Sequence, residues 1–418
     1  MSTDFLVPCQ WCVSTRKCES AWTVATAKCP EVDRVAHAFN CPLSPPVRYG
    51  FLDDFARTRA LPFIAASSAD TDQQIRTCLE NNVPNTNLLR RHAVSCEFVK
   101  TECVAILAFS PLDNAVVLTF RGTNGPVQVL IEAINIAIYA QKDFEPVGGK
   151  VVANFYDAFF KLWKAGLEVD LRQTMFQHPT AELWVFGHSL GGSIASLAAA
   201  WIARLGLIGT ERIRFVSFGQ PRTGNLEFAQ TFDNLVPYKY RVVHKGDCVS
   251  KLPARIPITD SSLFHHRYEV WYNNNMLAGD AYEVCESADS SACSGSVTDP
   301  ESLSSTNHLQ YYNDLVLSPS SAKEMGMIDV YRCMPGEFSV CFDGYTSGLE
   351  SFLVWVGVIL ALYCIFKNRP KDDQPRREEI PIVSIARTQQ PRHVEMPAIP
   401  HSPVPSAPPP ETPEPCAL

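Results

Sequence analysis

The sequence lacks three features that would each indicate a particular class of protein. It has no basic region suited to nucleic acid, because 44 acidic residues against 36 basic ones give a formal net charge of −8. It contains no Asn-x-Ser/Thr glycosylation site. Its first residues, Met1 to Pro8, have neither a basic stretch nor an apolar core, so no signal peptide is predicted there. We therefore expect no nucleic-acid partner.

Cysteine, by contrast, is abundant, with 15 residues in a chain of 418. This density favours disulfides and an oxidising compartment, although no signal peptide explains how the chain would reach one. Cys248 is the expected free thiol. Three pairs have a spacing that predicts local disulfides, namely Cys96/Cys103, Cys285/Cys293 and Cys333/Cys341.

Five of the cysteines crowd into residues 1–48, a segment too small to hold a core without cross-links. They are Cys9, Cys12, Cys18, Cys29 and Cys41. A zinc site at Cys9-x-x-Cys12 would need a second ligand pair at metal spacing, and the other three cysteines do not form one. We therefore expect disulfides here and no metal.

The strongest motif is Gly187-His188-Ser189-Leu190-Gly191, a G-x-S-x-G pattern. A short apolar run of strand composition precedes it, and a run of good helix formers, Ser193 to Leu205, follows it. This is the strand-to-helix context in which the pattern forms a nucleophile elbow. The turn would lift the Ser189 hydroxyl out of the sheet and place the Leu190 N–H at a helix start, where an oxyanion is stabilised.

Strand-like runs alternate with helical ones along the chain, which predicts an α/β fold with a mostly parallel central sheet. Functional groups gather at the carboxyl ends of such strands. Ser189, Asp247 and Thr123 each follow a predicted strand, and His308 lies in a predicted loop. The order Ser189, Asp247, His308 is that of an α/β-hydrolase triad, in which a histidine activates the serine and a carboxylate orients the histidine.

The chain has ten histidines, so nine others are alternatives to His308 as the base of this triad. His265 and His266 are the serious rivals, because the loop that carries them could approach Ser189. Histidines before the G-x-S-x-G motif break the chain order of the triad. His188, inside the motif, is expected to point away from the site.

The segment Val127 to Tyr139 is strongly apolar and rich in isoleucine. The residues leave two interpretations open. The segment is either a core helix or strand, or it is a mobile apolar flap, residues 127–141, over a lipid-binding cleft.

An uncharged apolar run, Phe352 to Phe366, lies near the end of the chain. As a helix it spans about 22 Å, and flanking residues bring the segment 348–367 close to the length of a transmembrane helix. Basic residues follow it, which predicts a cytosolic tail and a catalytic domain on the extracellular or lumenal side. The tail, 368–418, is rich in proline, so we expect it to be disordered and to offer polyproline II segments to a partner.

Four motifs, in this order, resemble the class 3 lipase family, in particular its animal, nematode-like members. They are F-R-G-T, V-F-G-H-S-L-G-G-S-I-A, S-F-G-Q-P-R-T-G-N and Y-R-V-V-H-K-G-D-C-V-S-K-L-P, within a region that runs from Tyr49 to Tyr312. The resemblance implies that Ser189 is the nucleophile, Asp247 the acid and His308 the base, with Thr123 and the Leu190 N–H forming the oxyanion hole.

The resemblance also bears on the flap and on the rest of the chain. It favours the flap, because the family's lid follows F-R-G-T, although the tryptophan-bearing helix usual in that lid is absent here. The chain then divides into a Cys-rich segment (1–48), a lipase-like α/β-hydrolase domain (49–330), a Cys-containing stalk (331–347), a transmembrane helix (348–367) and the tail (368–418).

We therefore expect a membrane-anchored serine ester hydrolase that cleaves acylglycerols or related lipid esters at a lipid interface. The reaction would pass through an acyl-enzyme and need no cofactor. A phospholipase or an esterase for soluble esters stays open as an alternative. So does a catalytically silent membrane receptor or adhesion protein, against which the intact triad argues.

Overall fold

The computed structural model describes most residues between 9 and 315, and all of these belong to one compact unit. The described ranges are 9–12, 17–20, 34–35, 39, 41–96, 101–123, 140–253, 262–299, 302–312 and 314–315. The stalk, the predicted transmembrane helix, the tail and residues 127–139 of the flap segment fall outside them. Within the described ranges, no helix combines the length and the apolar composition that crossing a bilayer requires.

An eight-stranded sheet in the order β13-β12-β11-β10-β9-β6-β5-β4 forms the centre of this unit. Its middle strands run parallel, and antiparallel pairs lie towards both edges. The parallel strands are β6 (Ala115–Phe120), β9 (Glu182–His188), β10 (Ile213–Phe218), β11 (Tyr238–His244) and β12 (Glu269–Tyr272). The others are β4 (Asn87–Cys96), β5 (Thr101–Ser110) and β13 (Glu283–Cys285). This sheet confirms the predicted α/β-hydrolase fold with a mostly parallel sheet.

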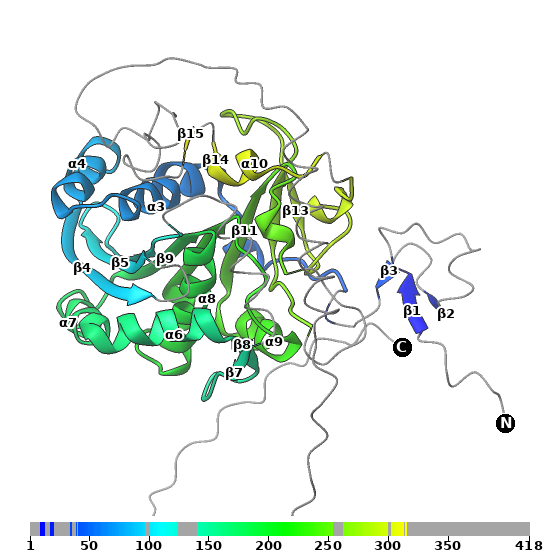
Figure 1. The fold of residues 1–418 in the computed structure, drawn as a ribbon, viewed down its shortest axis with the longest axis horizontal. Helices are drawn as coiled ribbons and strands as arrows, with labels where there is room; N and C mark the ends of the chain where they lie inside the picture. Colours follow the sequence, from blue (N-terminus) through cyan, green and yellow to red (C-terminus); the bar gives the residue numbers. More distant parts are fainter. Residues whose placement is uncertain are drawn as a thin grey trace, which may run out of the picture. The chain divides into compact units, whose positions relative to one another are not determined.

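Helices cover both faces of the sheet (Figure 1). One layer contains α2 (Asp53–Phe55), the π-helical turn η4 (Ala56–Ala60), α3 (Leu61–Ser67) and α4 (Asp72–Asn82). The other contains α6 (Ala153–Leu162), the π-helical turn η6 (Trp163–Leu167), α7 (Glu168–Gln177), α8 (Leu190–Arg204) and α9 (Leu226–Leu235).

Strand β6 shows how the sheet joins these two layers. Val116 and Leu118 pack with residues of α6 and α8, while Ala115 and Val117 pack with residues of α3. Alternate residues of a strand point to opposite faces, so a strand buried on both faces reads as a continuous apolar run. The central strands were predictable for this reason.

Shorter elements complete the described unit. They are β1 (Cys9–Cys12), β2 (Lys17–Ser20), β3 (Arg34–Val35), β7 (Gln141–Asp143), β8 (Lys150–Val152), β14 (Gln310–Tyr311), β15 (Asp314–Leu315), α10 (Ser305–Leu309) and the 3₁₀ turns η3 (Val47–Tyr49), η7 (Thr210–Arg212), η8 (Val249–Lys251) and η9 (Ser294–Ser296). Strands β1, β2 and β3 form a separate three-stranded sheet in the order β2-β1-β3.

Two disulfides confirm predictions from the cysteine spacing. Cys96 bonds to Cys103 across the β4–β5 pair, and Cys285 bonds to Cys293. Cys12 and Cys78 are also disulfide-bonded. Cys248 carries a free thiol, as predicted. Cys333 and Cys341 lie outside the described residues, so that pairing stays a prediction.

Arg267 ties the end of the Cys-rich segment to the hydrolase core. Its guanidinium donates hydrogen bonds to the carbonyl oxygens of Phe39 and Cys41 and lies 4.7 Å from the centre of the Phe39 ring. The same guanidinium pairs with Asp233 at 3.1 Å. Arg267 and Asp233 are both buried, so the carbonyl groups of the N-terminal segment provide acceptors for a charge that water does not reach.

Candidate active site

Ser189 lies on a sharp turn between the end of β9 and the start of α8. Its backbone angles, φ 57° and ψ −130°, are rare for a residue other than glycine. Close backbone packing on either side leaves room for glycine only. A Cβ atom on Gly187 would lie 2.2 Å from the Gly191 carbonyl oxygen, and one on Gly191 would lie 2.2 Å from the Phe120 carbonyl oxygen. The motif therefore adopts the geometry of a nucleophile elbow.

Asp247 and His308 meet beside this turn, although 61 residues separate them in the chain. His308 Nδ1 lies 2.9 Å from Asp247 Oδ2 and 3.0 Å from Oδ1, and both side chains are at most 1% exposed. An ionised carboxylate only accepts hydrogen bonds, so Nδ1 of the neutral imidazole carries the hydrogen. Nε2 is then left with a lone pair that can accept a proton.

The backbone around Gly219 brings the ends of three neighbouring strands to one place. The Ser189 N–H donates to the Phe218 carbonyl oxygen at 2.8 Å, which fixes the elbow to the end of β10. Gly219 comes next, with φ +56°, and a Cβ atom there would lie 2.5 Å from Asp247 Oδ2 and 2.7 Å from His308 Nδ1. Only glycine combines this backbone conformation with this close approach. Sequence reasoning missed Gly219, although its place directly after a predicted strand was a signal.

Neither of the two atoms that would exchange a proton, Ser189 Oγ and His308 Nε2, is engaged in another hydrogen bond among the described residues. Both atoms are buried. In unliganded active sites the nucleophile–base contact is often longer than in the complex with substrate. The structure thus brings His308 of α10 to Ser189 and Asp247, which follow the carboxyl ends of the parallel strands β9 and β11.

Polar contacts keep Asp247 ionised in spite of its burial. Burial alone would raise the pKa of this carboxyl, but His308 and a hydrogen bond from Tyr311 hold the pKa below its usual value. The Tyr311 hydroxyl donates to Oδ2 at 2.6 Å, and the Val249 N–H donates to Oδ1 at 2.8 Å. Tyr311 is a second residue that sequence reasoning missed, although it belongs to the same N-H-L-Q-Y-Y run as His308.

Two predictions about histidines are wrong in detail. His308 lies on the short helix α10 and not in a loop, and this helix starts with the Ser304 hydroxyl accepting from the Thr306 N–H. His188 does not point away from the site. Its ring stacks on that of His308, with 4.5 Å between ring centroids, and its Nε2 lies 2.7 Å from the His308 carbonyl oxygen. The sequence predicts a strand that ends at Phe186, whereas β9 continues to His188. The local sequence carries no information on which distant segment packs against His188.

The rival histidines make their contacts elsewhere. His265 Nε2 lies 2.8 Å from the Ser250 carbonyl oxygen, and His266 packs against the ring of Phe232. Burial, together with the cation of Arg241, lowers the pKa of both histidines well below the usual value. No described hydrogen bond joins either ring to Ser189 or Asp247, so His308 is the histidine that fits the site.

The two predicted oxyanion donors lie on neighbouring segments. Leu190 is the first residue of α8, so its N–H has no partner within the helix. Thr123 follows β6, and its hydroxyl is buried without a hydrogen-bond partner among the described residues. The contact between Gly191 and the end of β6 brings these two segments together.

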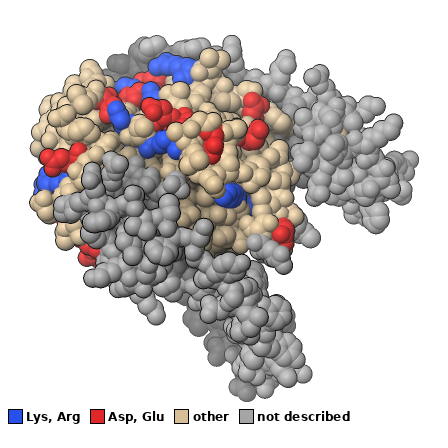
Figure 2. Space-filling model, turned by 90° about the horizontal axis from the view of Figure 1, so that it is seen from above, with Lys and Arg blue, Asp and Glu red and all other residues tan. Residues whose placement is uncertain are grey.

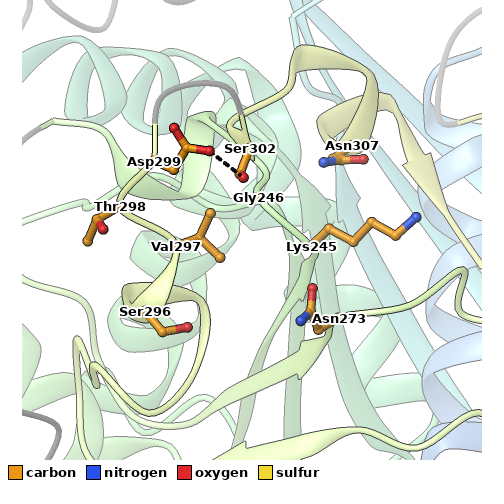
Figure 3. Close-up of a pocket in the computed structure, with 9 residues that line it drawn as sticks. All are labelled: Lys245, Gly246, Asn273, Ser296, Val297, Thr298, Asp299, Ser302 and Asn307. Atoms are coloured by element: carbon orange, nitrogen blue, oxygen red, sulfur yellow. Dashed lines mark hydrogen bonds between the residues drawn. The ribbon is translucent and has the colours of Figure 1, made fainter.

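Figure 3 shows the residues that line a polar cavity of about 450 Å³. Gly246 and Asn307 line it, and these are the chain neighbours of Asp247 and His308. Lys245 and Asn273 contribute from the ends of β11 and β12, and Asp299 accepts a hydrogen bond from Ser302 at its rim. No triad side chain lines this cavity, so it is distinct from the place where an ester would meet Ser189.

The charged side chains on the face in Figure 2 do not indicate a second kind of binding site. Basic and acidic side chains of the described residues lie interspersed there and do not form one continuous basic patch. Among the described residues, no group of three or more His, Cys, Asp or Glu side chains is placed to hold a metal ion.

Fold and site geometry together define a serine hydrolase of the α/β-hydrolase class. Comparison with known proteins narrows this class. The family model "Lipase (class 3)" matches residues 117–256. Lipase ZK262.3 of Caenorhabditis elegans is 31% identical over 252 residues, which cover 55% of this chain and 70% of that protein. The chain therefore belongs to the class 3 lipase family.

Fungal proteins show the same relationship at greater distance. Secreted mono- and diacylglycerol lipase 1 of Fusarium solani is 28% identical over 221 residues, which cover 50% of this chain and 60% of that protein. The structure of lipase II from Rhizopus niveus superposes with a TM-score of 0.53 at 22% identity, covering 67% of this chain and 98% of that one. The latter likeness concerns the fold.

Proposed function

We propose that this protein is a lipase that hydrolyses the carboxylic esters of acylglycerols, with Ser189 as nucleophile, His308 as general base and Asp247 as the residue that orients the base. The observation that carries the proposal is the buried contact of His308 Nδ1 with Asp247 beside the Ser189 elbow. This contact fixes the tautomer in which Nε2 can take a proton.

The first half of the reaction forms an acyl-enzyme. His308 Nε2 takes the proton of Ser189 Oγ while this oxygen attacks the ester carbonyl carbon, and the carbonyl oxygen becomes an oxyanion. The Leu190 N–H and Thr123 stabilise this charge, as does the positive end of α8. The C–O bond to the alcohol then breaks, and His308 returns its proton to the leaving alkoxide oxygen. Ser189 now carries the acyl group.

The second half regenerates the serine. A water molecule gives a proton to His308 Nε2, and its oxygen attacks the acyl carbon. The tetrahedral intermediate collapses, the bond to Ser189 Oγ breaks, and His308 returns the proton to that oxygen. The fatty acid leaves. Asp247 stays ionised throughout and stabilises the imidazolium in both halves.

The choice of acylglycerols rests on family relationship and on general chemistry. The Fusarium relative is named a mono- and diacylglycerol lipase. A phospholipase or an esterase for soluble esters would use the same triad, because the substrate is chosen by the pocket and the lid. Residues 127–141 are our candidate for that lid, a proposal that rests on their apolar composition and on their place after F-R-G-T.

A substrate series tests the proposed function. Purified protein would be assayed against a triacylglycerol emulsion, a monoacylglycerol, a phosphatidylcholine and a soluble short-chain ester, with Ser189→Ala as the control. We expect hydrolysis of the acylglycerols and its loss in Ser189→Ala. Hydrolysis of phosphatidylcholine alone would make it a phospholipase. No hydrolysis of any ester would favour the receptor or adhesion protein.

We also propose that segment 348–367 anchors the protein in a membrane with the hydrolase unit on the extracellular or lumenal side. The uncharged run at residues 352–366 and the disulfides Cys96–Cys103 and Cys285–Cys293 support this placement. Alkaline carbonate should leave the protein in the membrane pellet, and release into the supernatant would contradict an anchor. The proline-rich tail would then offer cytosolic polyproline II motifs to a partner.

A further inference from the structure

His188, the residue directly before the nucleophile, touches the catalytic base in two ways. Its ring lies on the His308 ring with a centroid distance of 4.5 Å and an interplanar angle of 29°. Its Nε2 lies 2.7 Å from the His308 carbonyl oxygen. A carbonyl oxygen only accepts hydrogen bonds, so Nε2 carries the hydrogen and donates it. One side chain thus contacts both the ring and the backbone of His308.

The His308 carbonyl group, which accepts this hydrogen bond, lies where few other donors can reach it. Helix α10 has only five residues, and His308 is its fourth. The last carbonyl groups of a helix have no partner within the helix. His308 is buried, so water is not at hand to satisfy its carbonyl. His188 therefore supplies a donor where the short helix cannot.

His188 can do this without disturbing the charge of the base. Burial, and next the neighbouring His308, lower the pKa of His188 to about 3, against smaller raising effects of the hydrogen bond to the His308 carbonyl and of Asp247. His188 is 5% exposed, and His308 and Asp247 are the two titratable side chains that affect its pKa. It stays neutral while His308 gains and loses its proton, so no like charge opposes the imidazolium.

We propose that His188 is a positioning residue that holds His308 in line with Ser189, through ring stacking and through the hydrogen bond to the His308 backbone. It belongs to the same rigid strand-to-helix turn as the nucleophile, so it sets the position of the base relative to that of Ser189. The inference rests on the proposed catalytic function of Ser189 and His308.

Three variants separate the two contacts. His188→Phe keeps an aromatic ring but has no donor, and His188→Gln keeps an N–H donor at a similar reach but has no ring. His92→Gln is the matched control, because His92 is also a buried histidine but lies on the edge strand β4, where it contacts Asp170. The readouts are the rate at which a fluorophosphonate reagent labels Ser189, kcat and KM for a soluble ester, and the pH–rate profile.

The expected result is a loss of rate without a loss of binding. His188→Phe should lower kcat and the labelling rate by about ten- to a hundredfold, because small misplacements of a reacting group cost that much. His188→Gln should lose less, and His92→Gln should match the wild type. KM should change by less than about twofold. The acidic limb of the pH–rate profile should stay in place, because the group removed is neutral.

The possible outcomes decide the question. Wild-type rates in both folded His188 variants would overturn the positioning role, and so would an acidic limb that moves by more than about half a pH unit, since His188 would then act through charge. If His188→Phe fails to fold, His188→Gln decides alone. Absence of labelling in the wild type would instead remove the proposed function, and this inference with it.

Discussion

The elbow around Ser189 and the base segment (residues 302–312) are held in place by different means. Close backbone packing that only glycine permits holds the elbow. The base segment contains only short elements, the five-residue helix α10 and the two-residue strand β14, and hydrogen bonds hold it in place. His188 contacts the His308 carbonyl oxygen, His244 Nδ1 lies 2.7 Å from the Gln310 carbonyl oxygen, and Tyr311 contacts the acid. In a region held by packing, one added atom should cause a large loss of stability. In a region held by hydrogen bonds, each hydrogen bond that is removed should cause a smaller, partial loss of function.

Removal of a reactive group should have the largest effect, in whichever region it lies. Ser189→Ala and His308→Ala should each lower kcat by about 10⁴- to 10⁶-fold, because members of a triad act as a unit. His265→Ala, which removes another buried histidine, should cost far less. Ester hydrolysis measured on folded proteins checks this. Near-wild-type activity in His308→Ala would show that the base is elsewhere, with His266 as the next candidate.

An added methyl group in the elbow should come next. In Gly187→Ala the new Cβ would lie 2.2 Å from the Gly191 carbonyl oxygen, so the turn cannot keep its geometry. We expect a loss of more than about 3 kcal/mol in the free energy of unfolding. Gly206→Ala is the control, since Gly206 has a positive φ but no atom within 4 Å, and should cost about 1 kcal/mol.

Urea unfolding of the two alanine variants distinguishes packing from backbone strain. If both variants lose the same small amount of stability, the elbow is more compliant than its packing indicates, and the contrast between the two regions fails.

Loss of one hydrogen bond to the acid should have an intermediate effect. Tyr311→Phe removes the donor to Asp247 Oδ2. It should lower the free energy of unfolding by about 1–2 kcal/mol and raise the activation free energy of hydrolysis by about the same amount. Tyr282→Phe is the control, because Tyr282 is 37% exposed. A Tyr311→Phe protein with wild-type stability and rate would show that Asp247 does not depend on this contact.

The pH dependence of stability gives Tyr311→Phe a second readout. The pKa of Asp247 is lowered in the folded protein, so its contribution to stability is complete above the ordinary pKa of about 3.9 and is lost as the pH falls through the lower folded value. Tyr311→Phe should move the folded pKa of Asp247 upwards. The variant should therefore lose less further stability than the wild type when both are acidified from pH 5.

Cys248 should have the smallest effect, although it directly follows the acid. Burial, and next Asp247, raise the pKa of its thiol to about 12, so it stays protonated at pH 8. Iodoacetamide should label it slowly in the native protein and rapidly after unfolding, as mass spectrometry can measure. Cys248→Ser should keep activity within about twofold. Rapid labelling of the native protein would show that the segment after β11 opens readily.

The same contrast explains which parts of the structure the sequence could predict. Strands β6, β10 and β11 have the bounds expected from their apolar runs, because both faces of each strand are buried. The elbow was predictable because its glycines are required by local geometry. Edge strand β4, with its mixed burial, had no such signal.

The base segment was predictable only in part. The chain order of the triad selects His308, but α10 is too short to show an apolar period, so the sequence predicts a loop there. The contacts of His188 and Tyr311 join residues 120 and 64 positions apart. Such contacts depend on how distant segments pack, and a local pattern of residues does not record that.

The hydrogen bonds from Arg267 to Phe39 and Cys41 set a limit on trimming the protein for recombinant production. A shortened chain that starts at Tyr49 would remove both carbonyl acceptors and the Phe39 ring from a buried guanidinium, leaving Asp233 as its partner. Such a chain exposes a face that residues before 49 cover in the full protein. A chain made for expression should therefore begin before residue 39, upstream of the boundary at residue 49 that composition alone indicates.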